Sequence, residues 1–234
     1  GLRGHLVLPG LVNTHVHAAM SCLRGLASDL PLDRWLFEVI FPAEAAHVSP
    51  EFVYRGTLLS CVEMLQNGVT TFCDGYFFEE SAARAVIEAG CRAVLGQGVL
   101  DFPSPDQPDP KRSRERAEQF LAAFPGHEPR LRPSLFCHAP YTCGAETLGW
   151  VKQPPEHGLH GLGVNLGILF QIHVSETAAE VRALRQQHGM APVRYLEQLG
   201  ILDDATLCAH CVWVDEDEIA VLARCGAGVA HDPE

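Results

Sequence analysis

Basic side chains are scarce in this sequence. Lysine and arginine together number 17 against 29 aspartates and glutamates in 234 residues, which gives a formal net charge of −12. A surface that follows a nucleic-acid backbone needs clustered lysine and arginine, so the charge balance argues against a nucleic-acid polymer as a partner. Long apolar runs are missing too, because no stretch approaches the ~18–20 residues that cross a bilayer, and no charged-then-apolar leader opens the sequence. We therefore expect a cytoplasmic protein with no membrane partner.

Linkers rich in serine, proline and glutamine are also absent. The hydrophobic share of 47% and charged share of 20% are typical of a globular chain. We expect one domain over residues 1–234. The nine cysteines are an odd number and lie mostly in apolar segments, which predicts reduced core residues. The sequence starts at Gly1 without a methionine and stops soon after a histidine-bearing segment, so both ends look cut.

Short apolar runs alternate with helical patterns along the whole chain. The runs predict seven strands, over residues 10–16, 69–73, 91–95, 132–138, 168–174, 206–210 and 227–231. The first predicted helix follows Ser49 as N-cap and Pro50 at the first helical position, and Gly68 lies just past its end. Further helices are predicted over residues 80–89, 114–124, 146–152, 178–188, 193–199 and 216–224. Such alternation requires a parallel sheet, either doubly wound or closed as a barrel.

Polar side chains at the strand ends decide between these two folds. Histidines or carboxylates follow most of the strands: His15, His17, Asp74, Asp101, His138, His173, His210 and His231. In a (β/α)8 barrel these ends converge on one mouth, whereas an open sheet would string them along an edge. We therefore predict an α/β protein with a (β/α)8 barrel, truncated after its seventh strand. Residues 153–167, rich in glycine and proline, interrupt the alternation, either as an insertion or as an irregularity of the reported sequence.

Three strand ends carry residues that fit metal chemistry. His15 and His17 are two residues apart on a strand, so both imidazoles project to one side and can chelate one ion. His173 could supply a third nitrogen, and Glu176 follows where the chain curls over the mouth. His210 could be a further ligand or could orient a water. The alternatives are satisfied core or surface histidines, and a glutamate favoured by the dipole of a helix N-terminus.

Other site types are excluded by pattern. Cys208 and Cys211 form a C-x-x-C, but we expect positions i and i+3 of a strand to face opposite sides, which argues against a redox or metal pair. The H-x-E and P-C-x-x-C signature of the cytidine-deaminase fold is missing. A Walker A loop, a G-x-G-x-x-G turn and a G-x-S-x-G elbow are missing as well.

Ordered motifs at six strand ends resemble the amidohydrolase superfamily, in particular its methylthioadenosine/S-adenosylhomocysteine deaminases and chlorohydrolases. The motifs are Pro9-Gly10-Leu11-Val12-Asn13-Thr14-His15-Val16-His17, Leu23-Arg24-Gly25, Trp35-Leu36, Phe41-Pro42-Ala43-Glu44, His138-Ala139-Pro140-Tyr141-Thr142, His173-Val174-Ser175-Glu176-Thr177 and Ala209-His210-Cys211-Val212-Trp213. They span nearly the whole chain, which makes the set far more specific than any one motif.

The resemblance implies a role for each matching residue. It implies one divalent metal ion, zinc or else iron or manganese, on His15, His17 and His173. Glu176 would be the catalytic acid/base that protonates a ring nitrogen of the substrate, and His210 would position the attacking water. Contacts to the substrate are implied for four residues: Glu44, His138, Gln97 and His231.

The resemblance also implies a reaction. Water would replace a ring amino group of an adenosine-like nucleoside or related aminopurine, with release of ammonia. Guanine or 8-oxoguanine deamination and triazine dechlorination are the alternatives, and the leaving group separates them. Gln97 stands where nucleoside deaminases often carry an arginine that meets the substrate's tail, which weighs against a carboxylate-bearing substrate.

Parts of the family pattern are missing. The carboxylate that follows the eighth strand in the family is not in the sequence, nor is the small β domain built from both termini. Asp232 is not expected to replace that carboxylate, because its side chain should face away from His231. We expect a small molecule as the partner, with a homo-oligomer as a further possibility. A different hypothesis is that this chain is a catalytically silent piece that at most binds a metal.

Overall fold

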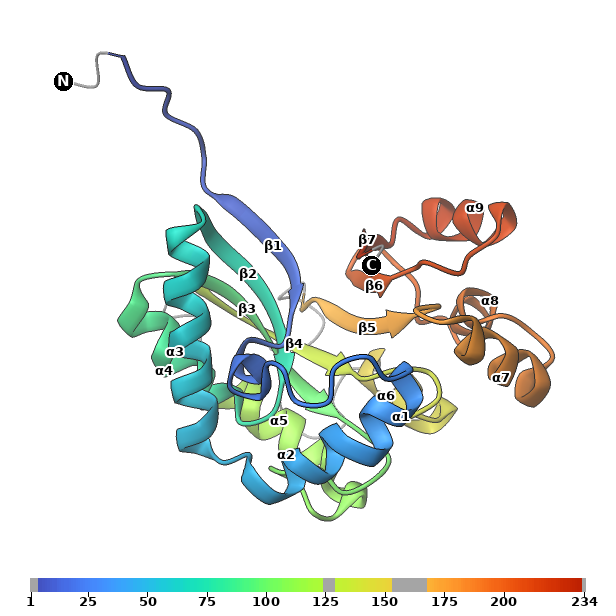
Figure 1. Ribbon diagram of the computed structural model, residues 1–234. Coiled ribbons are helices and arrows are strands. Elements are labelled where there is room, and N and C mark those ends of the chain that lie inside the picture. Colours follow the sequence, from blue (N-terminus) through green and yellow to red (C-terminus); the bar gives the residue numbers. More distant parts are fainter. Residues whose placement is uncertain (1–3, 124–128, 153–167, 233–234) are drawn as a thin grey trace.

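The computed structural model describes residues 4–123, 129–152 and 168–232. Seven strands lie side by side in chain order (Figure 1): β1 (Leu11–Val16), β2 (Val69–Tyr76), β3 (Arg92–Val99), β4 (Leu131–Cys137), β5 (Phe170–Val174), β6 (Thr206–His210) and β7 (Gly228–Ala230). Each strand pairs in parallel with the next. The sheet curls into a nearly closed barrel, since the rings of His15 on β1 and His210 on β6 are 5.0 Å apart. The predicted barrel with seven parallel strands is confirmed.

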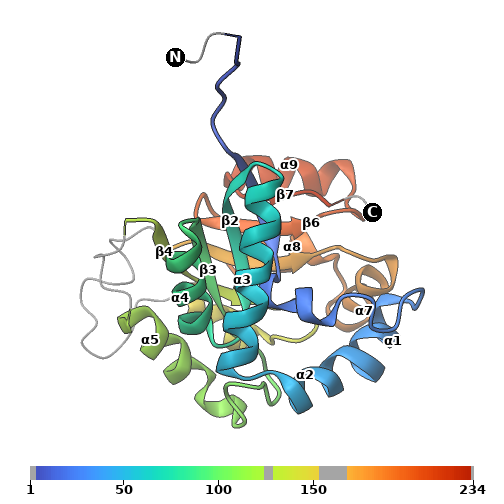
Figure 2. The same ribbon diagram turned by 60° about the vertical axis from the view of Figure 1, so that its left-hand side comes forward.

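Helices cover the outside of this sheet (Figures 1 and 2). They are α3 (Pro50–Gln66), α4 (Glu79–Ala89), α5 (Ser113–Ala123), α6 (Ala145–Lys152), α7 (Ala178–His188), α8 (Pro192–Gln198) and α9 (Glu216–Cys225). All seven begin and end within about two residues of the predicted bounds. The last residue of the helix predicted over 114–124, and the segment 153–167, lie outside the described residues. The predicted cap of α3 is also confirmed, because the Ser49 hydroxyl accepts a hydrogen bond from the Phe52 N–H at 3.2 Å.

A helical stretch between β1 and α3 was not predicted. It comprises η1 (Ala18–Leu23), α1 (Leu32–Arg34), η2 (Trp35–Ile40) and α2 (Phe41–His47). The η2 segment is a π-helix, in which the Phe41 N–H bonds to the Leu36 carbonyl five residues before it. This wider turn breaks the 3.6-residue period by which a helix is recognised in a sequence. A short helix η3 (Pro110–Arg112) precedes α5.

The core consists of two apolar clusters. One includes Phe72, Leu95 and Phe120 and lies among β2, β3 and helices α3 to α5. The other includes Ile172, Leu184 and Leu196 and lies among β4 to β6 and helices α6 to α9. Within residues 4–123, 129–152 and 168–232, no helix combines the length and the apolar character that crossing a bilayer requires.

Candidate metal and active site

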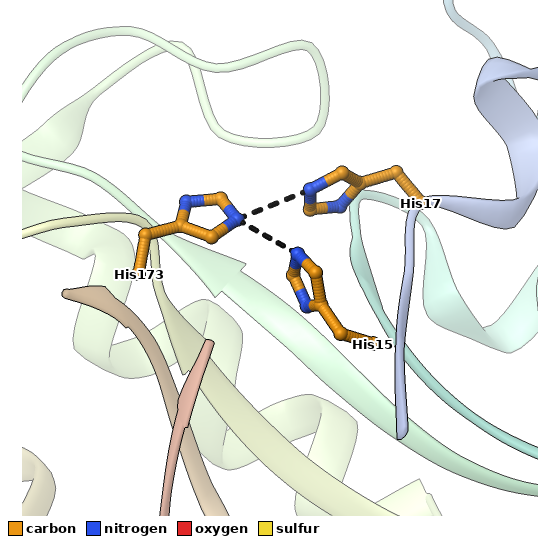
Figure 3. A group of neighbouring side chains, drawn as sticks. All are labelled: His15, His17 and His173. Carbon is orange, nitrogen blue, oxygen red and sulfur yellow. Dashed lines mark hydrogen bonds between the residues drawn. The ribbon is translucent and has the colours of Figure 1, made fainter. Parts of the chain in front are cut away.

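Three histidines from distant parts of the chain meet at the barrel mouth (Figure 3). His15 lies in β1, His17 follows β1 directly, and His173 lies in β5. The Nε2 atom of His173 is 3.2 Å from Nε2 of His17 and 3.2 Å from Nε2 of His15. The three ring nitrogens lie within 4.8 Å of one another, which is the arrangement of a candidate metal site.

Burial makes these rings neutral. Desolvation lowers the pKa of His15 to about 2 and that of His138 to about 3. It also lowers the pKa of His17 and of His210, and it holds the pKa of His173 well below its ordinary value. Neighbouring histidines contribute to these shifts, because two positive charges in one small site repel each other. Neutral imidazole is the form that binds a metal ion.

An acid and a further histidine flank this cluster. Glu176 follows β5, and its Oε1 atom is 3.7 Å from Nε2 of His210 at the end of β6. The pKa of Glu176 is raised to about 7, mainly by burial, with smaller contributions from the nearby Glu180 and Asp232. A carboxyl with such a pKa can both give and take a proton near neutral pH.

Asp232 approaches the cluster as well, which was not expected from the sequence. Its Oδ2 atom lies 3.6 Å from Nδ1 of His210, and its carboxylate forms a second potential ligand group with His15 and His210. The short strand β7 ends at Ala230, so the alternation that should turn this side chain away no longer applies to residue 232.

The cluster opens into a cavity of about 310 Å³. Its lining holds the five histidines and two acids of the site: His15, His17, His138, His173, His210, Glu44 and Glu176. The unpredicted helical stretch supplies most of an apolar wall: Leu32, Trp35, Leu36, Ile40 and Phe41. Glu44 is buried beside this wall and accepts a hydrogen bond from the Tyr76 hydroxyl at 2.6 Å. Burial raises the pKa of Glu44 to about 7.

Two residues predicted as substrate contacts do not line this cavity. Gln97 is fully buried, and its Nε2 group donates to the Asp106 carboxylate at 2.9 Å and to the Gly98 carbonyl at 3.1 Å. His231 is exposed, and its Nδ1 atom bonds to the His210 carbonyl at 2.8 Å. Its contact therefore supports the backbone of His210.

The expectation that Cys208 and Cys211 face opposite sides is wrong. Strand β6 ends at His210, and both His210 and Cys211 have left-handed backbone conformations, with φ of 74° and 49°. The chain therefore turns back, and the Cys211 thiol lies close enough to Cys208 to help raise the pKa of the Cys208 thiol.

Sequence reasoning missed two residues that shape the site. Tyr76, the partner of Glu44, lies three residues beyond the predicted end of its strand, so an accurate strand end would have included it. Glu180 is buried, and its carboxylate accepts the backbone N–H groups of Ser175 and Glu176 at 3.0 and 2.8 Å. The pattern Thr177-x-x-Glu180 at a helix start is a capping signal that could have identified it.

Comparison with known proteins yields a consistent set of relatives. The Amidohydrolase family model matches residues 6–234. The chain is 43% identical over 232 residues to 5-methylthioadenosine/S-adenosylhomocysteine deaminase of Aquifex aeolicus, covering 99% of this chain and 52% of that protein. It is 42% identical over 233 residues to 5'-deoxyadenosine deaminase of Methanothermobacter thermautotrophicus, covering 98% of this chain and 52% of that protein.

A solved structure agrees with these relatives. A zinc-bound adenosine deaminase from Xanthomonas campestris superposes with a TM-score of 0.87 at 35% identity, covering 97% of this chain and 49% of that one. The chain thus spans about half the length of the proteins it matches. Because the family model matches nearly every residue of a barrel whose mouth holds this histidine cluster, the chain belongs to the amidohydrolase family.

Proposed function

We propose that the whole protein is a metal-dependent aminohydrolase that replaces a ring amino group of an adenosine-like nucleoside with water and releases ammonia. The observation that carries this proposal is the meeting of three neutral imidazoles with a carboxyl of near-neutral pKa in one cavity. The deaminases among the relatives support the substrate class, since their names specify adenosine derivatives. We further propose that residues 1–234 belong to a single barrel domain.

The chemistry of the donor set fits a divalent metal ion. The Nε2 atoms of His15, His17 and His173 converge, and no arginine or lysine lines the described part of the cavity. Three nitrogen ligands with an open position are typical of catalytic zinc sites. A zinc ion held there would act as a Lewis acid that makes water nucleophilic at neutral pH. Zinc is favoured over iron or manganese by the zinc-bound relative.

Glu176 and His210 would manage the protons. His210 lies beside Glu176 and can accept a hydrogen bond from the attacking water, which fixes the water's direction. As the new carbon–oxygen bond forms, Glu176 donates a proton to the neighbouring ring nitrogen and takes one from the water. A second transfer delivers that proton to the amino group, which leaves as ammonia when the carbon–nitrogen bond breaks. The remaining proton of the new hydroxyl passes to Glu176, which restores its protonated form and leaves a ring carbonyl.

The rest of the cavity would hold the nucleoside. Glu44, backed by the Tyr76 hydroxyl, can accept hydrogen bonds from ribose hydroxyls. His138 lies between the metal cluster and Phe41, with its ring 5.0 Å from that of His173, so it can contact the base. The apolar wall of Trp35, Leu36 and Ile40 would pack against the sugar and its 5′ substituent.

The test combines metal, ligand and product. The 234-residue chain is loaded with Zn²⁺, and binding of 5′-methylthioadenosine is measured by equilibrium dialysis, followed by an assay for ammonia. We expect about one zinc per chain, saturable binding and ammonia release. Glu176→Gln is expected to keep both zinc and nucleoside while ammonia release falls by a factor of at least 10²–10⁴. Glu146→Gln, an exposed change on α6, is the matched control and should change neither.

Three results would contradict parts of this proposal. If the chain binds no zinc, the proposed metal site is contradicted. A chain that binds zinc but neither binds nor deaminates the nucleoside favours a silent, metal-binding piece. Release of chloride from a chlorotriazine, with no ammonia from aminopurines, would make the reaction a dechlorination.

A further inference from the structure

Asp74 is a fully buried carboxylate on β2 with an unusual pair of partners. Its Oδ1 atom accepts a hydrogen bond from the backbone N–H of Ala18 at 2.9 Å and another from the backbone N–H of Gly75 at 3.1 Å. Ala18 follows His17 directly in the chain. A single oxygen therefore ties the segment that carries His17 to the end of the neighbouring strand.

The ladder between β1 and β2 is irregular at the same place. The paired residues are Asn13 with Phe72 and then Val16 with Asp74, so β1 advances three residues while β2 advances two. The extra residue on β1 leaves the chain around His15 without the regular ladder of a parallel pair. The Asp74 carboxylate replaces the missing ladder bond directly after His17, where the first N–H of η1 needs an acceptor.

Gly75 connects this carboxylate to the imidazole of His17. The Gly75 carbonyl oxygen is 2.6 Å from Nδ1 of His17. A carbonyl oxygen only accepts hydrogen bonds, so Nδ1 of the neutral ring must carry the hydrogen. Nε2 then has its lone pair free, and it is this atom that lies 3.2 Å from Nε2 of His173.

We propose that Asp74 is a positioning residue for the metal site, because its Oδ1 atom accepts both the backbone N–H that follows His17 and the N–H of Gly75, the residue whose carbonyl selects the His17 tautomer. The inference rests on the proposed metal site but concerns the ring before any ion binds. Partners of ligand histidines of this kind orient the ring and set which nitrogen faces the metal.

The first test needs no variant and no metal. The metal-free chain is labelled with ¹⁵N in its histidine rings, and the coupling pattern of each ring nitrogen shows which one carries hydrogen. We expect His17 to be locked in the Nδ1–H form, with its hydrogen protected from exchange. His17 in the Nε2–H form, or in rapid exchange between both forms, would overturn the proposal.

The second test removes the Oδ1 atom of Asp74 by substitution. Asp74→Ala is expected to weaken Zn²⁺ binding about 10- to 100-fold, measured by competition with a chelating dye, and to release His17 into a mixture of tautomers. Asp74→Asn keeps an oxygen that can accept both N–H bonds, so it should retain zinc affinity within about threefold. The control is Asp101→Ala, because the Asp101 carboxylate likewise accepts two bonds, from the Gly144 N–H and the Thr147 hydroxyl, and neither partner adjoins a ligand histidine in the chain.

The outcomes separate this inference from the proposed function. Wild-type chain that binds no zinc contradicts the proposed metal centre, while the tautomer of His17 still decides the role of Asp74. Wild-type chain that binds zinc no more tightly than Asp74→Ala overturns the positioning role alone. Equal losses in Asp74→Ala and Asp101→Ala would also overturn it, since a general loss of loop order would then explain the effect.

Discussion

The buried carboxyl of Glu44 in the cavity makes the folded chain less stable at high pH. Burial raises its pKa to about 7 from the ordinary 4.5, so between these values the folded chain holds a proton that the unfolded chain has released. Stability is therefore lost as pH rises through this window, and the loss is complete above pH 7. We predict that the free energy of unfolding at pH 8 is roughly 3 kcal/mol larger for Glu44→Gln than for wild type. The glutamine keeps an acceptor for the Tyr76 hydroxyl but has no proton to lose.

Urea unfolding of both chains from pH 4 to pH 8 measures this difference. The two should be equally stable near pH 4 and diverge between pH 4.5 and 7. The exposed Glu146→Gln serves as control and should track wild type at every pH. Parallel curves for Glu44→Gln and wild type would show that the carboxyl is not held neutral by burial.

Gly75 permits a close contact beneath the histidines. A Cβ atom at this position would lie 2.6 Å from the Phe136 ring, which packs at 5.0 Å from the ring of His173. We predict that Gly75→Ala destabilises the chain by about 1–3 kcal/mol and weakens Zn²⁺ binding, because Phe136, which packs against His173, must move to make room for the added methyl group. Gly149→Ala on α6 is the contrasting change, since no atom lies within 4 Å of its Cβ. Thermal unfolding measures the stability of both variants, and zinc titration measures their affinity for Zn²⁺. Equal stability and equal affinity in the two variants would contradict the prediction.

Single residues were predictable where strand alternation or a known motif applied to them. The convergence of His15, His17 and His173 could be predicted, because each lies at the end of a clear apolar run, and the structure brings the three together. The surroundings of Gln97 could not be predicted, because a strand pattern alone does not reveal that its side chain donates a hydrogen bond to Asp106. Nor could alternation place Asp232, which lies beyond the end of its strand.

The connection between β5 and α7 gives a prediction at the scale of elements. Ser175 has a left-handed φ of 53°, and its hydroxyl is buried without a hydrogen-bond partner among the described residues. A left-handed conformation costs a residue with a Cβ roughly 1–2 kcal/mol. We predict that Ser175→Gly raises the free energy of unfolding by about 0.5–1 kcal/mol, after the larger entropy of glycine in the unfolded chain is subtracted.

Urea unfolding tests this change against Ser113→Gly. Ser113 has a helical φ of −58°, so glycine there relieves no strain and should destabilise the chain. If both substitutions destabilise equally, the turn at Ser175 is not strained.

Elements were predictable where their ends carry capping signals. Ser49 before α3 and Asp215 before α9 both cap their helices through their side chains. The stretch over residues 32–47 lacks such a signal, since Arg34 and Ile40 provide no capping side chain, and its π-helical turn shifts the apolar period. The wall of the cavity was missed for this reason.

Metal binding gives a prediction at the scale of the whole molecule. An ion held by His15 and His173 would join β1 to β5, which are not neighbours in the sheet. Zinc at a concentration 100 times its Kd should therefore stabilise the folded chain by about 2.7 kcal/mol. Thermal unfolding with zinc, and again after a chelator, measures the shift. His173→Ala should lose it and the exposed His47→Ala should keep it, whereas a shift that survives in His173→Ala would place the ion elsewhere.

The barrel itself was predictable, because strict alternation of strand and helix leaves few topologies and the polar strand ends favour closure. The alternation of strand and helix does not determine the register between neighbouring strands. The extra residue between Asn13 and Val16 arises from the contact of β1 with a strand more than fifty residues away, and no local pattern encodes it.

The order of the strands has a consequence for biosynthesis. Every strand pairs with its predecessor, so each β/α unit can dock on the part of the barrel already made as the chain leaves the ribosome. The nitrogens of His15 and His173, by contrast, belong to residues 158 positions apart. The first two histidines are therefore made four strands before His173, and a nascent chain could not hold an ion through the three proposed ligands until most of the barrel has emerged.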